Sequence, residues 1–261
     1  MKKLIFAAAL ITALIPFAAA QEVRLPQASL DRDVDVQVPG RAAVLGNPPH
    51  QVPGAPSYCK PCLFYAGDFD STASDANGLA NEKDIIVSTG AAVYSPFLVP
   101  RGGTWHVTGL FTDDFLSAKV LDPPTSPYEI RTDIPAGGGS GGKLVCHGKL
   151  HATAIPTGLS DFGYEIYAVR VEGIKKCRLK TGTYWESVVP YCTNSKDNAC
   201  ADYRGFEAND DGAMAHRHGP LEPANDSFFN SVFFGAVWEP SSEQQSSGRF
   251  SAGVIGTAKL K

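Results

Sequence analysis

The sequence lacks three features that would point directly to a function. Beyond residue 17 it has no apolar run of membrane-spanning length. It has no excess of positive charge, since 23 basic residues face 27 acidic ones, and the basic residues are scattered. This charge pattern argues against a nucleic-acid-binding protein. It also has no H-E-x-x-H, and its literal G-x-S-x-G match, residues 138–142, lies in a glycine run followed by a strand-like segment and not by the helix of a nucleophile elbow.

The N-terminus is typical of a secretory signal peptide. Lys2 and Lys3 precede an apolar run that ends near Phe17, and Ala18 to Ala20 form an A-x-A cleavage pattern. The alternative, a retained membrane anchor, fits less well because the run is short for a bilayer span. We therefore predict that residues 1–20 are removed, which changes the net charge from −4 to −6. The mature protein is expected in the periplasm or outside the cell, without a membrane anchor.

The remaining chain divides into two parts by composition. Residues 21–57 are rich in proline, which disfavours helices and sheet ladders, so a partly disordered linker is predicted. Residues 58–261 carry short apolar or alternating runs between turn-forming residues, the pattern of an all-β domain. We expect one β-sandwich of jelly-roll type with few short helices. Trp105 and Trp185 lie in alternating runs and are predicted to be core residues.

Six cysteines follow the predicted cleavage site, an even number that favours disulfides in an exported protein. The spacing predicts local bridges Cys59–Cys62 and Cys192–Cys200, which leaves Cys146 with Cys177. A redox centre at Cys59 and Cys62 is less favoured because no helix is predicted to follow. A zinc site is less favoured because no second pair has a similar spacing. Partner exchange among the cysteines stays open.

Two segments contain side chains that metal ions prefer. Calcium takes six to eight oxygen ligands, and an acidic loop offers such ligands although it does not match the EF-hand spacing. Its candidate residues are Asp68, Asp70, Asp75, Asn77, Glu82 and Asp84. His216 and His218 form a His-x-His pair that could bind zinc or copper. In both cases the alternative is a solvated surface loop, and no other cofactor is expected.

Signals for catalysis are weak. Residues 137–142, GGGSGG, match G-x-G-x-x-G, but a strand-like run follows instead of a helix, so a flexible strand connection is predicted. Glu129, Glu165 and Glu186 lie in strand-like runs and could flank a sugar. A β-protein of this size carries such residues by chance, so the pattern does not identify a hydrolase.

Trp238 lies where an apolar run gives way to a polar loop. It could be the last core residue of its strand. It could also be an aromatic platform at the sheet rim that stacks on a sugar or on an apolar patch of a partner.

Two stretches, VYSPFLVP (93–100) and TWHVTGLF (104–111), show the pattern V-Y-x-x-F-x-V-P followed by W-x-V-T-G-L-F. In this the chain resembles a group of largely uncharacterised exported bacterial β-sandwich proteins, over roughly Leu63 to Thr257. The resemblance implies a secreted sandwich, sometimes likened to carbohydrate-binding or adhesion modules. It implies no catalytic residues, and the cysteines and the His-x-His pair lie outside it.

Together these observations predict an exported, non-enzymatic β-sandwich that binds a glycan or a surface protein or serves as a structural module. The alternative is a secreted hydrolase that acts on polysaccharide. An exposed aromatic platform would favour binding, whereas two carboxyl groups in one cleft, about 5–10 Å apart, would favour hydrolysis.

Overall fold

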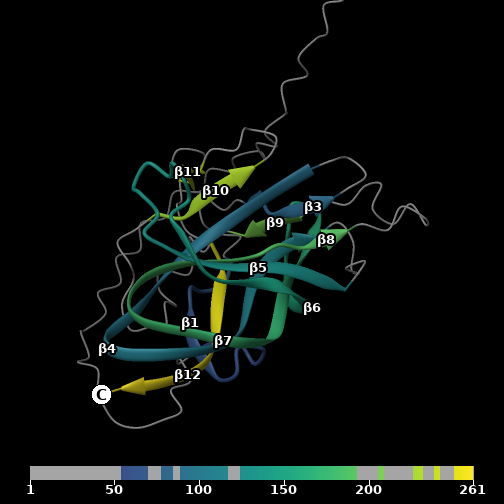
Figure 1. Cartoon of the computed structure of the whole chain (residues 1–261). Coiled ribbons are helices and arrows are strands. Elements are labelled where there is room, and N and C mark those ends of the chain that lie inside the picture. The colour runs from purple at the N-terminus through teal and green to yellow at the C-terminus, as the bar shows by residue number, and fades with distance from the viewer. Residues whose placement is uncertain are drawn as a thin grey trace, which may run out of the picture.

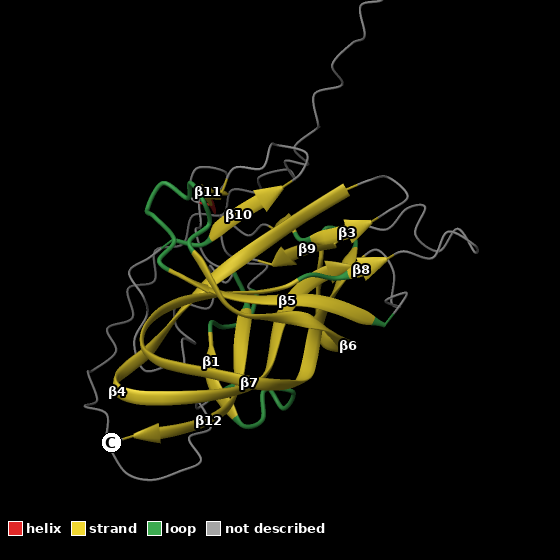
Figure 2. Cartoon of the chain, viewed as in Figure 1, coloured by secondary structure: helices red, strands yellow, loops and turns green. Residues whose placement is uncertain are grey.

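The computed structural model describes residues 54–69, 78–84, 89–116, 124–192, 205–208, 226–231, 238–241 and 250–260 (Figure 1). Almost all of this part of the chain is strand or the connection between strands (Figure 2). The predicted all-β, sandwich-like class is therefore confirmed. The predicted signal peptide and almost all of the predicted linker lie outside the described residues. No helix among the described residues has the length and apolar character needed to cross a bilayer.

The described strands, in chain order, are β1 (Cys62–Tyr65), β2 (Gly78–Ala80), β3 (Glu82–Asp84), β4 (Thr89–Leu116), β5 (Thr125–Thr132), β6 (Lys143–Asp161), β7 (Tyr164–Val188), β8 (Tyr191–Cys192), β9 (Gly205–Ala208), β10 (Phe228–Ser231), β11 (Trp238–Pro240) and β12 (Ala252–Leu260). The main path of neighbours is β1-β12-β4-β7-β5-β6. All pairings are antiparallel except the short parallel pair of β3 with β8.

Three long strands, β4, β6 and β7, each pass through two layers of the sandwich. The first part of β4 pairs with the end of β7, which also pairs with β5. The second part of β4 pairs with the beginning of β7 and with β12. Likewise β6 pairs first with β5 and then with β7. We call the layer that contains β5 the β5 layer and the layer that contains β12 the β12 layer. Strands that change sheets at corners are a known way of joining packed sheets.

The corner of β4 falls at Pro100–Gly103, where its pairing with β7 is interrupted between Val99 and Thr104. Gly102 has φ +78°, a conformation that other residues rarely adopt, and a Cβ on Gly103 would lie 2.9 Å from the carbonyl oxygen of Pro100. These two glycines allow the strand to turn from one layer into the other.

The core lies between the two layers. It combines Phe97, Ile130 and Val188 of the β5 layer with Leu110, Val169 and other apolar residues of the β12 layer. Trp105 belongs to this core, 2% exposed, and its ring stacks on Phe97 with centroids 5.9 Å apart. Trp185 is also buried, 5% exposed, but in a separate cluster on the outer face of the β5 layer. Both tryptophans are therefore core residues, as predicted.

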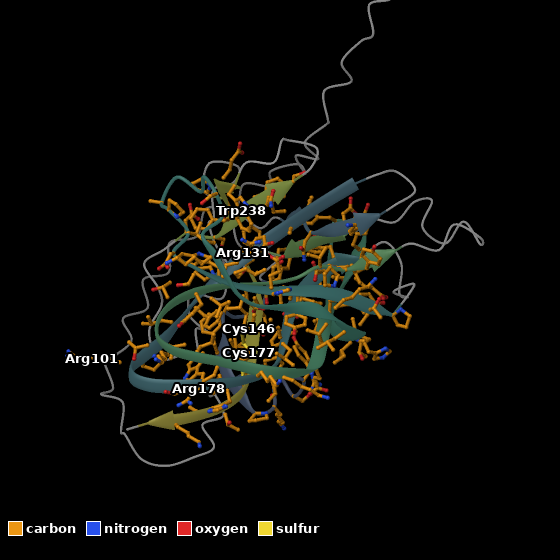
Figure 3. All side chains as sticks on the ribbon, in the orientation of Figure 1. Arg101, Arg131, Cys146, Cys177, Arg178 and Trp238 are labelled. Atoms are coloured by element: carbon orange, nitrogen blue, oxygen red, sulfur yellow. A yellow bond between two sulfur atoms is a disulfide. The ribbon has the colours of Figure 1, made fainter. Side chains whose placement is uncertain are left out.

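Two of the three predicted disulfides are present. Cys59–Cys62 closes a turn that packs with Tyr58 and Tyr65 over Phe111 of the β12 layer. Cys146–Cys177 joins β6 to β7 with a Cα–Cα distance of 5.7 Å and lies in the main core (Figure 3). The third predicted pair involves Cys200, which lies outside the described residues. Two disulfides are compatible with an oxidising compartment.

Candidate ligand-binding face

The outer face of the β5 layer carries most of the candidate binding residues. Side chains alternate along a strand, so residues opposite each other in register point to the same side. Ile130 lies opposite Glu186, and Ile130 is buried in the core. Glu129 and Ser187, which are also opposite each other, therefore belong to the outer face.

An aromatic cluster covers one end of this face. Its members are Tyr94, Ile134, Trp185, Phe228 and Trp238. The rings of Tyr94 and Trp238 have centroids 4.2 Å apart, and Trp238 is 5% exposed. The structure thus places Trp238 among buried residues, as in the core interpretation. It leaves the indole almost no free surface for the alternative role as a stacking platform.

The glycine-rich segment 137–142 packs directly on Trp238. A Cβ on Gly141 would lie 2.2 Å from Cε2 of the indole, and one on Gly138 would lie 1.8 Å from the Trp238 carbonyl oxygen. Gly139 also forms an isolated β-bridge with Trp238. The glycines are therefore required by close approach to this strand. The prediction of a merely flexible strand connection missed that contact.

A polar network borders the aromatic cluster. Tyr94 donates a hydrogen bond to Oε2 of Glu129 at 2.9 Å, and Nε of Arg131 donates to the same oxygen at 2.6 Å. The Arg131 guanidinium lies 4.7 Å from the centroid of the Trp238 ring (Figure 3), a cation–π contact. Burial, with the nearby Glu129 carboxylate, raises the pKa of Tyr94. Tyr94 therefore stays protonated and acts as a hydrogen-bond donor.

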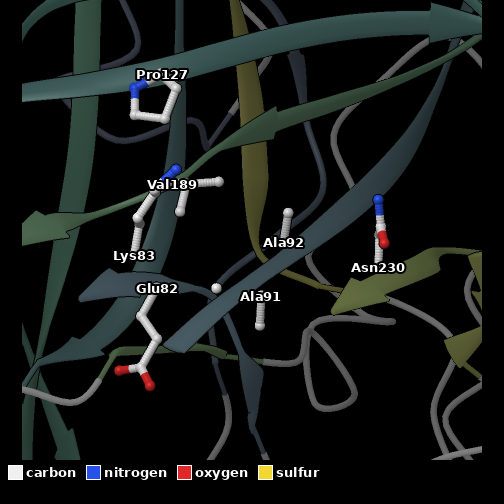
Figure 4. A pocket seen from close by; sticks show the side chains of 8 residues that line it. Glu82, Lys83, Ala91, Ala92, Pro127, Val189 and Asn230 are labelled. Atoms are coloured by element: carbon white, nitrogen blue, oxygen red, sulfur yellow. The ribbon is translucent and has the colours of Figure 1, made fainter. Parts of the chain in front are cut away.

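Next to the aromatic cluster the outer face forms an open groove of about 180 Å³ (Figure 4). It is lined by Glu82, Lys83, Gly90, Ala91, Ala92, Pro127, Val189 and Asn230. Three of the lining residues, Gly90, Ala91 and Ala92, are small. The Pro127 carbonyl accepts a hydrogen bond from the Val189 amide at 3.1 Å, which holds the two residues side by side. Asn230 lies opposite Ala92 in register and opposite Trp238 on the other side, so the groove adjoins the aromatic cluster.

Two lysines approach the ring of Tyr191 at the end of the groove. Lys149 Nζ lies 4.1 Å from the ring centroid and Lys83 Nζ lies 5.8 Å from it. Lys83 lies opposite Tyr191 in the parallel pair of β3 and β8, and Lys149 lies opposite Pro127. His147 and His151 are exposed on the same side of β6 as Lys149. Sequence reasoning missed this site because its residues come from three separate strands.

A different polar group is buried inside the β4 strand, where Asp113 and Asp114 are 1% and 0% exposed. Ser251 Oγ donates to Asp113 at 2.6 Å. Asn81 Nδ2 and Thr112 Oγ1 donate to Asp114 at 2.8 Å and 2.7 Å. Burial, together with nearby Asp68 and Asp114, raises the pKa of Asp113 to about 8 despite the opposing effect of the Ser251 hydrogen bond. Burial likewise raises the pKa of Asp114 to about 7.

Glu186 is fully buried between the layers. Burial raises its pKa well above the ordinary value, and the proximity of Asp113 and Asp114 adds to this effect. The Gly253 amide acts against this increase, but neither carboxyl oxygen of Glu186 has a hydrogen bond of good geometry. Burial of this kind favours the neutral form of the carboxyl group. Its position corrects the expectation that Glu186 could flank a sugar.

The other predicted site residues are dispersed or lie outside the described residues. Asp68 accepts a short hydrogen bond from Tyr65, whereas Glu82 is buried beside Ala91 in register. Asp84 pairs in β3 with Cys192. Asp70, Asp75, Asn77, His216 and His218 lie outside the described residues. Within the described part, no three His, Cys, Asp or Glu side chains lie close enough together to hold a metal ion. Glu165 is exposed and accepts a hydrogen bond from Tyr167.

No known protein-family model matches this chain, and it matches no curated protein. The candidate site is therefore argued from its own geometry.

Proposed function

We propose that this protein is an exported binding module that holds one sugar unit of a glycan in the groove between Lys83 and Asn230, without cleaving it. The observation that carries the proposal is the composition of the groove. It combines the apolar surfaces of Pro127, Val189 and Ala92 with the Asn230 amide. A sugar ring presents CH groups and hydroxyl groups side by side, and this lining offers a partner for each.

The size of the groove supports a single sugar unit. Its volume of about 180 Å³ lies below the ~300–1,000 Å³ of pockets that enclose drug-sized ligands. The groove is also open, so a polymer could continue beyond it in both directions. A ligand of this kind would be held by several weak contacts along the face.

Hydrolysis is less well supported, because it needs two carboxyl groups that flank one glycosidic bond. Glu129 and Glu186 come from adjacent strands, but Glu186 faces the core with Ile130 whereas Glu129 is on the outer face. Asp113 and Asp114 are also buried. Glu82 lines the groove but is itself buried. Glu129 lies on the outer face, and Tyr94 and Arg131 already occupy one of its oxygens.

The test is a glycan-binding screen with the purified mature protein, in which released reducing sugar is measured in the same wells. We expect at least one glycan to bind and no sugar to be released.

The variant Ala92→Leu would place a larger side chain in the groove and should weaken that binding. The matched control, Ala258→Leu, adds the same side chain at a half-buried position on β12 and should leave binding unchanged. Release of sugar would support the hydrolase instead, and equal binding by both variants would remove the groove from the proposal.

A further inference from the structure

The Tyr191 ring has two ammonium groups beside it and no described counterion. Lys149 and Lys83 approach the ring from β6 and β3. Among the described residues, neither lysine forms an ion pair with a carboxylate. Three ion pairs are formed elsewhere in the described part, by Arg131, Lys143 and Arg170. Both lysine residues are exposed, and their positive charges have no carboxylate partner within the described part of the chain.

This concentration of positive charge contrasts with the chain as a whole, whose net charge is −4. Two like charges near one ring repel each other, and the ring quadrupole offsets only part of that repulsion. An anionic group that reaches both ammonium groups beside the ring would reduce the repulsion and accept a charge-assisted hydrogen bond from each. His147 and His151 lie on the same side of β6 and extend the polar surface.

The lysines are continuous with the groove. Lys83 itself lines the groove, and Lys149 lies opposite Pro127, another lining residue. A sugar unit in the groove would therefore bring its substituents, or those of the next unit, next to the two ammonium groups.

We propose that the ligand is an acidic glycan, one whose carboxylate or sulfate group binds between Lys83 and Lys149 beside Tyr191. This inference rests on the proposed function, because it places the anionic group relative to a sugar in the groove. An acidic protein segment would share the charge, but a protein interface depends on large buried anchors. The residues that line the groove include no large aromatic side chain, which fits a sugar better.

The experiment compares acidic glycans with neutral counterparts of the same backbone. The probes are oligogalacturonate and its methyl ester, oligomannuronate, and chondroitin sulfate with its desulfated form. Polyglutamate serves as an acidic polymer without sugar. One double variant carries Lys83→Gln and Lys149→Gln. The matched control is the double variant Lys175→Gln/Lys180→Gln, which removes two exposed charges on β7. Melting temperatures of all three proteins show whether the fold is kept.

We expect an acidic glycan to bind more tightly than its neutral counterpart, with an affinity that falls as salt is added. The Lys83/Lys149 double variant should lose about tenfold or more in affinity for the acidic glycan, because two partly exposed ion pairs with the ligand are lost. The control double variant should keep its affinity.

Equal binding of acidic and neutral forms would overturn this inference and leave the proposed function standing. An equal loss of affinity in both double variants would show only a general charge effect and would also overturn this inference. Binding to polyglutamate alone would indicate a protein partner, and no binding to any glycan here or in the broader screen would contradict both proposals.

Discussion

Gly141 and Trp238 are in such close contact that a Cβ atom on the glycine would lie 2.2 Å from the indole ring. Gly141 also has φ +72°, where other residues are strained. We therefore expect Gly141→Ala to lower the free energy of unfolding by more than about 2 kcal/mol, through overlap with the ring and backbone strain. Chemical denaturation followed by tryptophan fluorescence measures the change.

The control for this prediction is Gly137→Ala, in the same loop. A Cβ there meets nothing within 4 Å, and the backbone is not in the left-handed region. Its effect should stay within about 0.5 kcal/mol. If the two variants unfold alike, the loop does not pack on Trp238 in solution.

The burial of Trp238 gives a second prediction. Its ring packs on Tyr94 and under the Arg131 guanidinium, so Trp238→Ala should cost about 3–5 kcal/mol of stability. Leu144→Ala removes a side chain that is 41% exposed and should cost under about 1 kcal/mol. A Trp238→Ala variant that keeps its stability but loses ligand binding would restore the platform interpretation.

The buried carboxyl groups predict an unusual dependence on pH. The pKa of Asp113 is about 8 in the folded chain, against an ordinary value of 3.8, so the folded state holds a proton that the unfolded chain has released. Stability should therefore fall as pH rises from about 4 to about 8, by more than about 1 kcal/mol. Denaturation curves across this range measure it.

Asp113→Asn keeps the shape of the side chain and removes its ionisation. The variant should lose part of the pH dependence and gain stability relative to the parent at pH 9. Asp161→Asn, at a half-exposed position at the end of β6, is the matched control and should keep the parent's profile. An unchanged slope in Asp113→Asn would mean that Asp113 is ionised in the folded state throughout.

The disulfide between β6 and β7 should contribute measurably to stability. Its sequence separation is 31 residues, for which loop-closure entropy gives about 3–4 kcal/mol. The double variant Cys146→Ala/Cys177→Ala should lose a comparable amount, and a loss below about 1 kcal/mol would contradict the entropic account. Non-reducing peptide mapping of the parent also tests the predicted Cys192–Cys200 pair. A free thiol at either position would refute that pairing.

The all-β class could be predicted from sequence because alternation and turn residues are local signals. The length of the strands could not. The stretches VYSPFLVP (93–100) and TWHVTGLF (104–111) are separated in the sequence by glycines, but both belong to β4, which continues through its corner at Gly102 and Gly103. Proline and glycine usually end a strand; here they bend one. The same local reasoning would place the paired Asp113 and Asp114 on the surface, whereas packing on both faces of β4 buries them.

The candidate site was harder to predict for a related reason. Lys83, Lys149 and Tyr191 are far apart in the chain and come together only through the register of β3, β5, β6 and β8. A basic residue in an exposed strand position has no distinctive pattern of its own. The disulfides Cys59–Cys62 and Cys146–Cys177, by contrast, followed from spacing and from the remaining cysteines, because the number of cysteines is small.

The most direct test of the central claim is the location of a bound glycan on the protein. Amide chemical shifts of the isotopically labelled mature protein should be followed by NMR while a glycan found by the screen is added. We expect the largest shifts at Lys83, Ala92, Val189 and Asn230, around the groove. The largest shifts at the edge formed by β1 and β12, with the groove signals unmoved, would contradict the account.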